Sequence, residues 1–95
     1  MKLEMEKVRS EKCYSVGYIP GIDKYVLVCV VPWIAWYNRY YEITKEEYNF
    51  FGTNQLDELA RLLYGQGIQS TRFLFSDKNE ENTSEQLELR EKVLT

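Results

Sequence analysis

The sequence predicts an α+β domain in which two helices cover one face of a mostly antiparallel sheet of four or five strands, with a further helix at the C-terminus. Three observations support this prediction. Tyr25–Val31 is a continuous apolar, mostly β-branched run, which is typical of a strand buried on both faces. An alternating segment and a Pro-Gly turn precede that run, as in a hairpin. Two segments with helix-capping signals follow it.

Residues 1–23 are expected to begin the sheet. Residues 1–10 fit either a short edge strand or a lead-in helix. Residues 13–19 alternate in character along the chain, which predicts a strand. A turn follows, in which Pro20 presets φ at the second position and Gly21 is expected to accept a positive φ at the third.

Two further strands are predicted before the helices. The central strand, about Lys24–Val31, meets Pro32, which cannot donate a hydrogen bond to a neighbouring strand. After a turn or bulge at Trp33–Trp36, the next strand is expected at Tyr37–Ile43. That strand mixes aromatic and polar groups on both faces, so we expect one face to be partly exposed.

Two helices are predicted from their caps. Thr44–Glu47 has the sequence of a capping box and begins a short helix that ends at Gly52. Thr53 or Asn54 begins the second helix, and Gly65 is expected to be the residue just beyond its end. Apolar residues of this helix recur at i, i+3, i+4 and i+7, namely Leu56, Leu59, Ala60 and Leu63.

The C-terminal third is expected to add one strand and one helix. The last strand is predicted at residues 68–76. We expect it to lie inside the sheet, because Phe73–Phe75 puts large apolar groups on both faces. Residues 77–84 are typical of a solvated linker, and the final helix has a thin apolar stripe. With 95 residues, a single domain over 1–95 is expected, of which 77–95 is an acidic linker plus this helix.

Charge and composition argue against nucleic-acid and membrane partners. The net charge is −3; residues 77–95 carry six Asp/Glu and three Lys/Arg, whereas residues 1–76 carry nine of each. An acidic end opposes direct binding of nucleic acid. The longest apolar stretch, residues 25–37, is shorter than the roughly twenty residues that span a bilayer, so no membrane partner is expected. The charged N-terminal segment has no apolar core typical of a secretory signal, which favours a cytoplasmic location.

The residue types needed for common catalysis are scarce. The sequence has no histidine, and its two cysteines, Cys13 and Cys29, form no Cys-x-x-Cys motif. The commonest general base, the usual partner of a Ser or Cys nucleophile, and His-containing or four-cysteine zinc sites are therefore missing. Paired acids such as Glu46/Glu47 have a simple explanation at helix N-termini. We therefore predict no enzyme activity, no cofactor and no metal.

Two groups of side chains are candidates for binding a protein partner. One is an aromatic cluster between residues 33 and 41, which either forms a binding surface or packs against the helices. The other is the acidic segment 77–91, which is either a solvated tail or a recognition surface for a basic partner. The expected partner-binding residues are Asp77, Glu80, Glu81, Glu85, Glu88, Trp33, Trp36 and Tyr37.

The segment Trp33–Tyr48, followed later by Arg72–Ser76, resembles small bacterial immunity proteins of the contact-dependent growth-inhibition type. These are cytosolic antidotes encoded beside toxins. The resemblance lies in size, acidity and the absence of histidine and of a targeting signal. It implies a non-enzymatic protein that binds a cognate toxin with a basic surface, often a nuclease, and neutralises it by covering the cationic active site.

Two alternatives stay open. One is a small-molecule-binding domain or enzyme whose pocket is lined by Tyr37, Tyr40 or Tyr41 as hydroxyl donors, which a closed apolar cavity beneath their strand would favour. The other is a structural homo-oligomer built on an edge of the sheet. The sequence predicts no particular oligomeric state.

Overall fold

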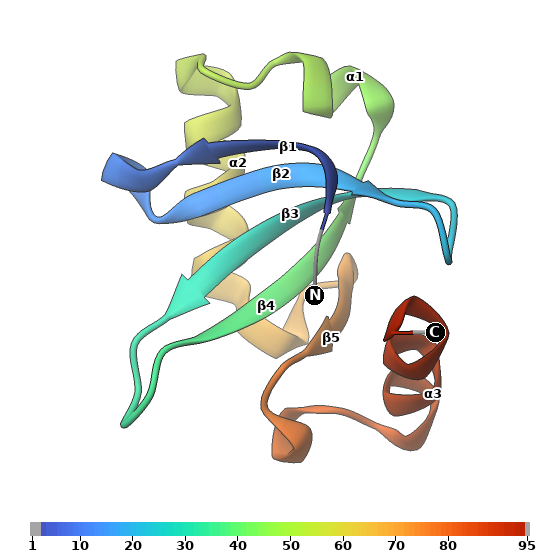
Figure 1. The fold of residues 1–95 in the computed structure, drawn as a ribbon. Coiled ribbons are helices and arrows are strands. Elements are labelled where there is room, and N and C mark those ends of the chain that lie inside the picture. The colour runs from blue at the N-terminus through green and yellow to red at the C-terminus, as the bar shows by residue number, and fades with distance from the viewer. Residues whose placement is uncertain (1–2, 95) are drawn as a thin grey trace.

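A five-stranded antiparallel sheet forms the centre of the computed structural model, which describes residues 3–94 (Figure 1). The strands follow one another in the sheet in chain order, so each is joined to its neighbour without a crossover. This arrangement confirms the expected α+β fold with a mostly antiparallel sheet. The strands are β1 (Glu4–Arg9), β2 (Tyr14–Ile19), β3 (Lys24–Val31), β4 (Tyr37–Ile43) and β5 (Phe73–Ser76).

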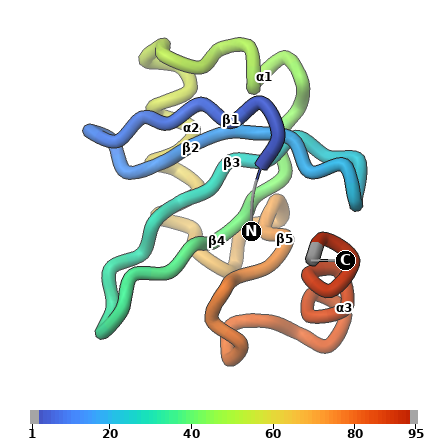
Figure 2. The backbone as a smooth tube through the Cα atoms, in the orientation of Figure 1, coloured from blue at the N-terminus to red at the C-terminus, as the bar shows by residue number. Residues whose placement is uncertain are grey.

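Helices cover both faces of the sheet. Two of them pack on one face, as expected, and the third packs on the other (Figures 1 and 2). The α-helices are α1 (Lys45–Asn49), α2 (Asn54–Gln66) and α3 (Ser84–Leu94), and the short 3₁₀ turns are η1 (Ser10–Lys12), η2 (Gly67–Gln69) and η3 (Asn79–Glu81). No helix within residues 3–94 is long and apolar enough to cross a membrane.

The central strand supplies side chains to two separate cores. Leu27 and Cys29 of β3 lie in the core under α1 and α2, while Val26 and Val28 lie in the core under α3. All four are at most 4% exposed, so the strand is buried on both faces as its continuous apolar run predicts. The partly buried side chains of α3 that pack on the second core are Leu89 and Val93.

The expectation that the last strand lies inside the sheet is wrong. In the described part of the chain β5 is an edge strand that pairs with β4. It is also shorter than predicted, because η2 and a turn occupy residues 67–72. Phe73 packs in the first core, and Leu74 and Phe75 pack in the second. A helical layer on each face buries both sides of an edge strand, so its apolar pattern does not require an inner position.

The β2–β3 turn also differs from its prediction. The positive φ, +51°, belongs to Asp23 rather than to Gly21, and the Tyr18 hydroxyl donates a hydrogen bond to the Asp23 carboxylate. Asp tolerates this backbone conformation better than most residues. Gly21 is needed for a different reason: a Cβ added there would lie 2.9 Å from the Lys92 carbonyl oxygen of α3.

We therefore expect Gly21→Ala to weaken the packing of α3 on the sheet. The added methyl group displaces the helix, and the free energy of unfolding falls by about 1 kcal/mol, as for other overpacked contacts. Urea denaturation of wild type and variant measures the loss. Gly65→Ala is the matched control, because apart from its chain neighbours and the backbone of its own helix no described atom lies within 4 Å of its added Cβ. Helix propensity predicts that this control gains about 0.5–1 kcal/mol. Equal stabilities of the two variants would contradict the assigned role of Gly21.

The predicted helix starts are confirmed. At α1 the Thr44 hydroxyl accepts from the Glu47 amide at 3.0 Å, and the Glu47 carboxylate accepts from the Thr44 amide at 2.8 Å. Thr53 caps α2 through its hydroxyl. The predicted end of α2 is wrong: the helix continues through Gly65 and stops at Gly67, whose φ of +60° cannot extend it.

Candidate interaction surface

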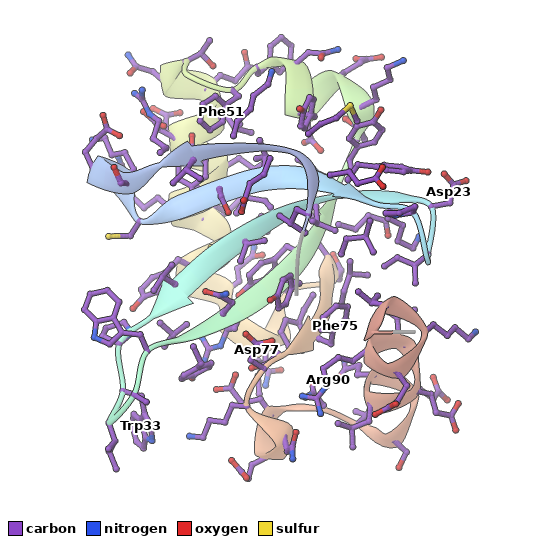
Figure 3. The ribbon with its side chains drawn as sticks, in the orientation of Figure 1. Asp23, Trp33, Phe51, Phe75, Asp77 and Arg90 are labelled. Atoms are coloured by element: carbon purple, nitrogen blue, oxygen red, sulfur yellow. The ribbon has the colours of Figure 1, made fainter. Side chains whose placement is uncertain are left out.

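The hairpin between β3 and β4 exposes three large apolar side chains within four consecutive residues. Trp33 is 61% exposed, Ile34 95% and Trp36 70%. We call residues 32–36 the hairpin tip; it projects at one corner of the molecule, and Figure 3 labels Trp33 there. Single exposed apolar residues are ordinary on a protein surface, whereas a contiguous group of them marks an interaction site.

The acidic C-terminal segment approaches the base of this hairpin. The Lys78 ammonium lies 4.1 Å from the ring centroid of Trp33 and 5.8 Å from that of Tyr37. An ammonium at this distance over an aromatic face is attracted to it electrostatically. Residues that are far apart in sequence, those of the hairpin and those around η3, therefore form one surface.

A hydrogen-bonded ion pair, which we call the clasp, holds the two segments together. Arg39 donates from Nε to Glu81 Oε1 at 2.9 Å and from Nη2 to Glu81 Oε2 at 2.6 Å. The Tyr37 hydroxyl donates to Glu81 Oε2 at 2.7 Å. The Arg39 and Glu81 side chains are only 17% and 13% exposed. The clasp comprises Tyr37, Arg39 and Glu81, and it joins β4 to η3 on the side of the hairpin.

The clasp keeps Glu81 ionised. Hydrogen bonds from Arg39, and to a smaller extent from Tyr37, lower the pKa of Glu81 to about 2 although burial acts in the opposite direction. Burial and the hydrogen bond to Glu81 raise the pKa of the Tyr37 hydroxyl, which therefore remains protonated at neutral pH. The surface beneath the hairpin tip thus contains a paired carboxylate rather than a free one.

Residues 77–82 are anchored to the sheet, so the expectation of a solvated linker is wrong for them. The Asn82 side chain accepts from the Ser76 amide at 2.7 Å and donates to the Ser76 carbonyl at 2.9 Å. Arg90 of α3 also donates to that carbonyl at 2.9 Å, and to Asn79 Oδ1 at 2.6 Å. Polar side chains here form hydrogen bonds within the chain, which a hydrophilic composition does not reveal.

The predicted acidic residues divide into two sets. Glu81 belongs to the clasp, whereas Asp77 and Glu80 are exposed near it, and Figure 3 shows Asp77 just beyond the end of β5. Glu85 and Glu88 are exposed on α3. The structure therefore gathers the first three around the base of the hairpin and places the last two on a neighbouring helix.

The aromatic cluster also divides. Tyr40 is 2% exposed and stacks on Phe75 at 4.7 Å between centroids, and Tyr41 is fully buried with its ring edge against Phe73. Packing therefore accounts for the rings of these two tyrosines and does not account for the exposed tryptophans. Tyr40 and Tyr41 lie in different cores, on opposite faces of the sheet, so these two side chains do not face a common pocket.

Three residues of this surface were not predicted from the sequence. Ile34 is the most exposed large apolar side chain among the described residues, and its position between Trp33 and Trp36 in the segment that follows Pro32 was a usable signal. The roles of Arg39 and Lys78 had no such signal, because their partners lie about forty residues away in the chain.

No protein-family model, curated protein or solved structure matches this chain. Within residues 3–94, no group of three or more Cys, Asp and Glu side chains is placed to hold a metal ion. The features of the described structure that bear on function are the hairpin tip, the clasp and the exposed carboxylates between residues 77 and 88.

Proposed function

We propose that this protein is a non-enzymatic immunity protein, which binds a cognate bacterial toxin and neutralises it by covering a cationic active site, expected to be that of a nuclease. The observation that carries the proposal is the hairpin tip. It exposes two tryptophans and an isoleucine on a hairpin that the clasp fastens to the rest of the fold.

The tip has the composition of an interface centre. Tryptophan is enriched among the few residues that dominate binding energy, and each such residue typically contributes 2 kcal/mol or more. A surface that is ordered before binding loses less conformational entropy on association. The clasp supplies that order, since it ties Tyr37 and Arg39, which directly follow the tip, to η3.

The charges favour a basic partner. Exposed carboxylates of Asp77 and Glu80 lie near the clasp, and those of Glu85 and Glu88 lie farther from the tip on α3, which packs on the other face of the sheet (Figure 1). A nuclease binds phosphates and therefore carries a cationic active site, which carboxylates can occupy in place of the substrate. Such complementarity increases the association rate more than it slows dissociation, and salt weakens it.

The charge-reversed variant Glu80→Lys/Glu85→Lys/Glu88→Lys tests the electrostatic part. We expect its association rate constant with the toxin to fall about 10-fold or more at low salt, while the dissociation rate changes little. The unfolding free energy should fall by at most about 1 kcal/mol, because one of these residues lies in the first turn of α3. Stopped-flow fluorescence over a range of salt concentrations measures the rates.

The matched control reverses three exposed glutamates elsewhere, as Glu6→Lys/Glu46→Lys/Glu58→Lys. It changes the net charge by the same amount on β1, α1 and α2. If the loss of association rate is specific to η3 and α3, this control should associate with the toxin faster than the test variant does. Equal slowing of the two would place the interface outside η3 and α3.

The function itself is tested with the protein encoded by the neighbouring gene. Calorimetry should give a one-to-one complex, and adding this protein should suppress the nuclease activity of its partner in proportion to the complex formed. No complex, or a complex that retains full activity, would overturn the proposal.

A further inference from the structure

A cavity of about 380 Å³ lies between α2 and the adjoining ends of β2 and β3. Its volume is within the range of about 300–1,000 Å³ that small-molecule sites occupy. Buried Tyr14, Cys29 and Ala60 line its inner part, and the exposed side chains of Trp36 and Tyr64 line it nearer to solvent. The cavity is therefore apolar and aromatic, with room for a planar ring.

The inner wall is electrically neutral. Burial raises the pKa of the Cys29 thiol to about 12, and burial together with Asp57 raises the pKa of the Tyr14 hydroxyl. Both groups therefore remain protonated at neutral pH. The Cys29 thiol contacts the Ala60 carbonyl oxygen at 3.9 Å, so this side of the cavity presents no strong unpaired polar group.

Among the residues that the structure describes, Asp57 supplies the one carboxylate in the cavity wall, and it is already paired. Arg9 donates to both oxygens of Asp57 at 3.0 Å, and the Tyr14 hydroxyl donates to Oδ1 at 2.6 Å. These donors hold the pKa of Asp57 below its ordinary value, so it stays ionised and neutralised by Arg9. Glu11 interacts electrostatically with Arg9 and Tyr14 but does not line the cavity.

Two cations remain at the cavity. Lys12 and Arg61 both line it and are exposed, and within residues 3–94 neither side chain forms a hydrogen bond or an ion pair. Lys12 interacts with Asp57 at longer range only. An apolar, ring-sized interior bordered by two unpaired cations matches a ligand with an aromatic body and one negative charge.

We propose that this cavity binds a small aromatic monocarboxylate, with its ring against Trp36 and Tyr64 and its carboxylate at Lys12 and Arg61. This site is separate from the proposed toxin interface except for Trp36, which belongs to both. No partner protein is needed to test it, so its failure leaves the proposed function unaffected.

Titration of ¹⁵N-labelled protein with indole-3-acetate, followed by amide chemical shifts, tests the site. We expect a Kd on the order of 1 mM or lower, as for a ligand of this size. The shift changes should centre on residues 12–14, 29–30 and 57–64. Indole-3-acetamide has the same ring and no charge, and it should bind at least 5-fold more weakly.

Variants identify the carboxylate contacts. Lys12→Gln and Arg61→Gln should each weaken binding of indole-3-acetate by 3-fold or more and leave binding of the amide unchanged. Lys45→Gln, an exposed lysine at the start of α1, is the matched control and should have no effect. Equal affinities for indole-3-acetate and indole-3-acetamide would overturn the proposal. Amide shift changes that are confined to the hairpin tip and are the same in Lys12→Gln and Arg61→Gln would also overturn it. So would the absence of saturable shifts at 10 mM ligand, a concentration about tenfold above the expected Kd.

Discussion

The double variant Trp33→Ser/Trp36→Ser is expected to bind the toxin at least 100-fold more weakly than wild type. Two tryptophans at an interface centre account for at least about 4 kcal/mol if each contributes a typical 2 kcal/mol, although such contributions are not additive. Both side chains are mostly exposed, so their removal leaves the cores intact. The unfolding free energy should change by less than about 1 kcal/mol, mainly through the lost contact between Trp33 and Lys78.

Calorimetry gives the loss of affinity, and urea denaturation gives the change in stability. The control is Val8→Ser/Leu62→Ser, which removes two apolar side chains with 62% and 56% exposure from β1 and α2. It should bind the toxin as wild type does. Wild-type affinity of the tryptophan variant would place the interface away from the hairpin. The single variant Trp33→Ser should weaken toxin binding without altering the cavity that Trp36 lines.

The variant Glu81→Gln is expected to lose about 2 kcal/mol of unfolding free energy at pH 7. Replacing one partner of a mostly buried ion pair leaves the other charge uncompensated, here the guanidinium of Arg39. For a domain of this size such a loss lowers Tm by roughly 8–16 °C. Glu42→Gln is the control, because the Lys24–Glu42 pair is 33% and 49% exposed and such pairs contribute about 0–1 kcal/mol.

The loss should depend on pH in a direction set by the pKa of Glu81. That pKa falls from an ordinary 4.5 to about 2 on folding, so the stabilisation is complete above pH 4.5 and disappears as the pH falls toward 2. Wild type and Glu81→Gln should therefore differ most at neutral pH and converge in acid. A constant difference between pH 7 and pH 2.5 in urea denaturation would show that the clasp does not stabilise the fold through an ionised Glu81.

Loss of the clasp should also affect binding. Without Glu81 the base of the hairpin is no longer tied to η3, so the tip must be ordered during association. We expect Glu81→Gln to weaken toxin binding several-fold even though Glu81 itself is mostly buried and need not touch the partner. Glu81, predicted as a contact residue, is thus proposed to act by positioning the tip.

Local signals were sufficient for most of the secondary structure. The strand at Lys24–Val31 and the strand at Tyr37–Ile43 have the predicted bounds, and the capping box at Thr44 begins α1 as expected. Each of these depends on residues close together in the chain: a β-branched run, a proline, or a hydroxyl three residues before a glutamate. The sequence also identified the tryptophans and the acidic segment as candidates for a surface.

The tertiary structure alone decided which candidates are exposed and which are paired. Alternation in β4 assigns Tyr40 and Tyr41 to opposite faces, but both are buried because a helical layer lies across each face. The pairing of Arg39 with Glu81 joins residues about forty positions apart in the chain. The cavity beside α2 is likewise formed by residues that are far apart in the sequence. Sequence patterns report periodicity along the chain, whereas burial and charge pairing depend on what the fold brings from far along it.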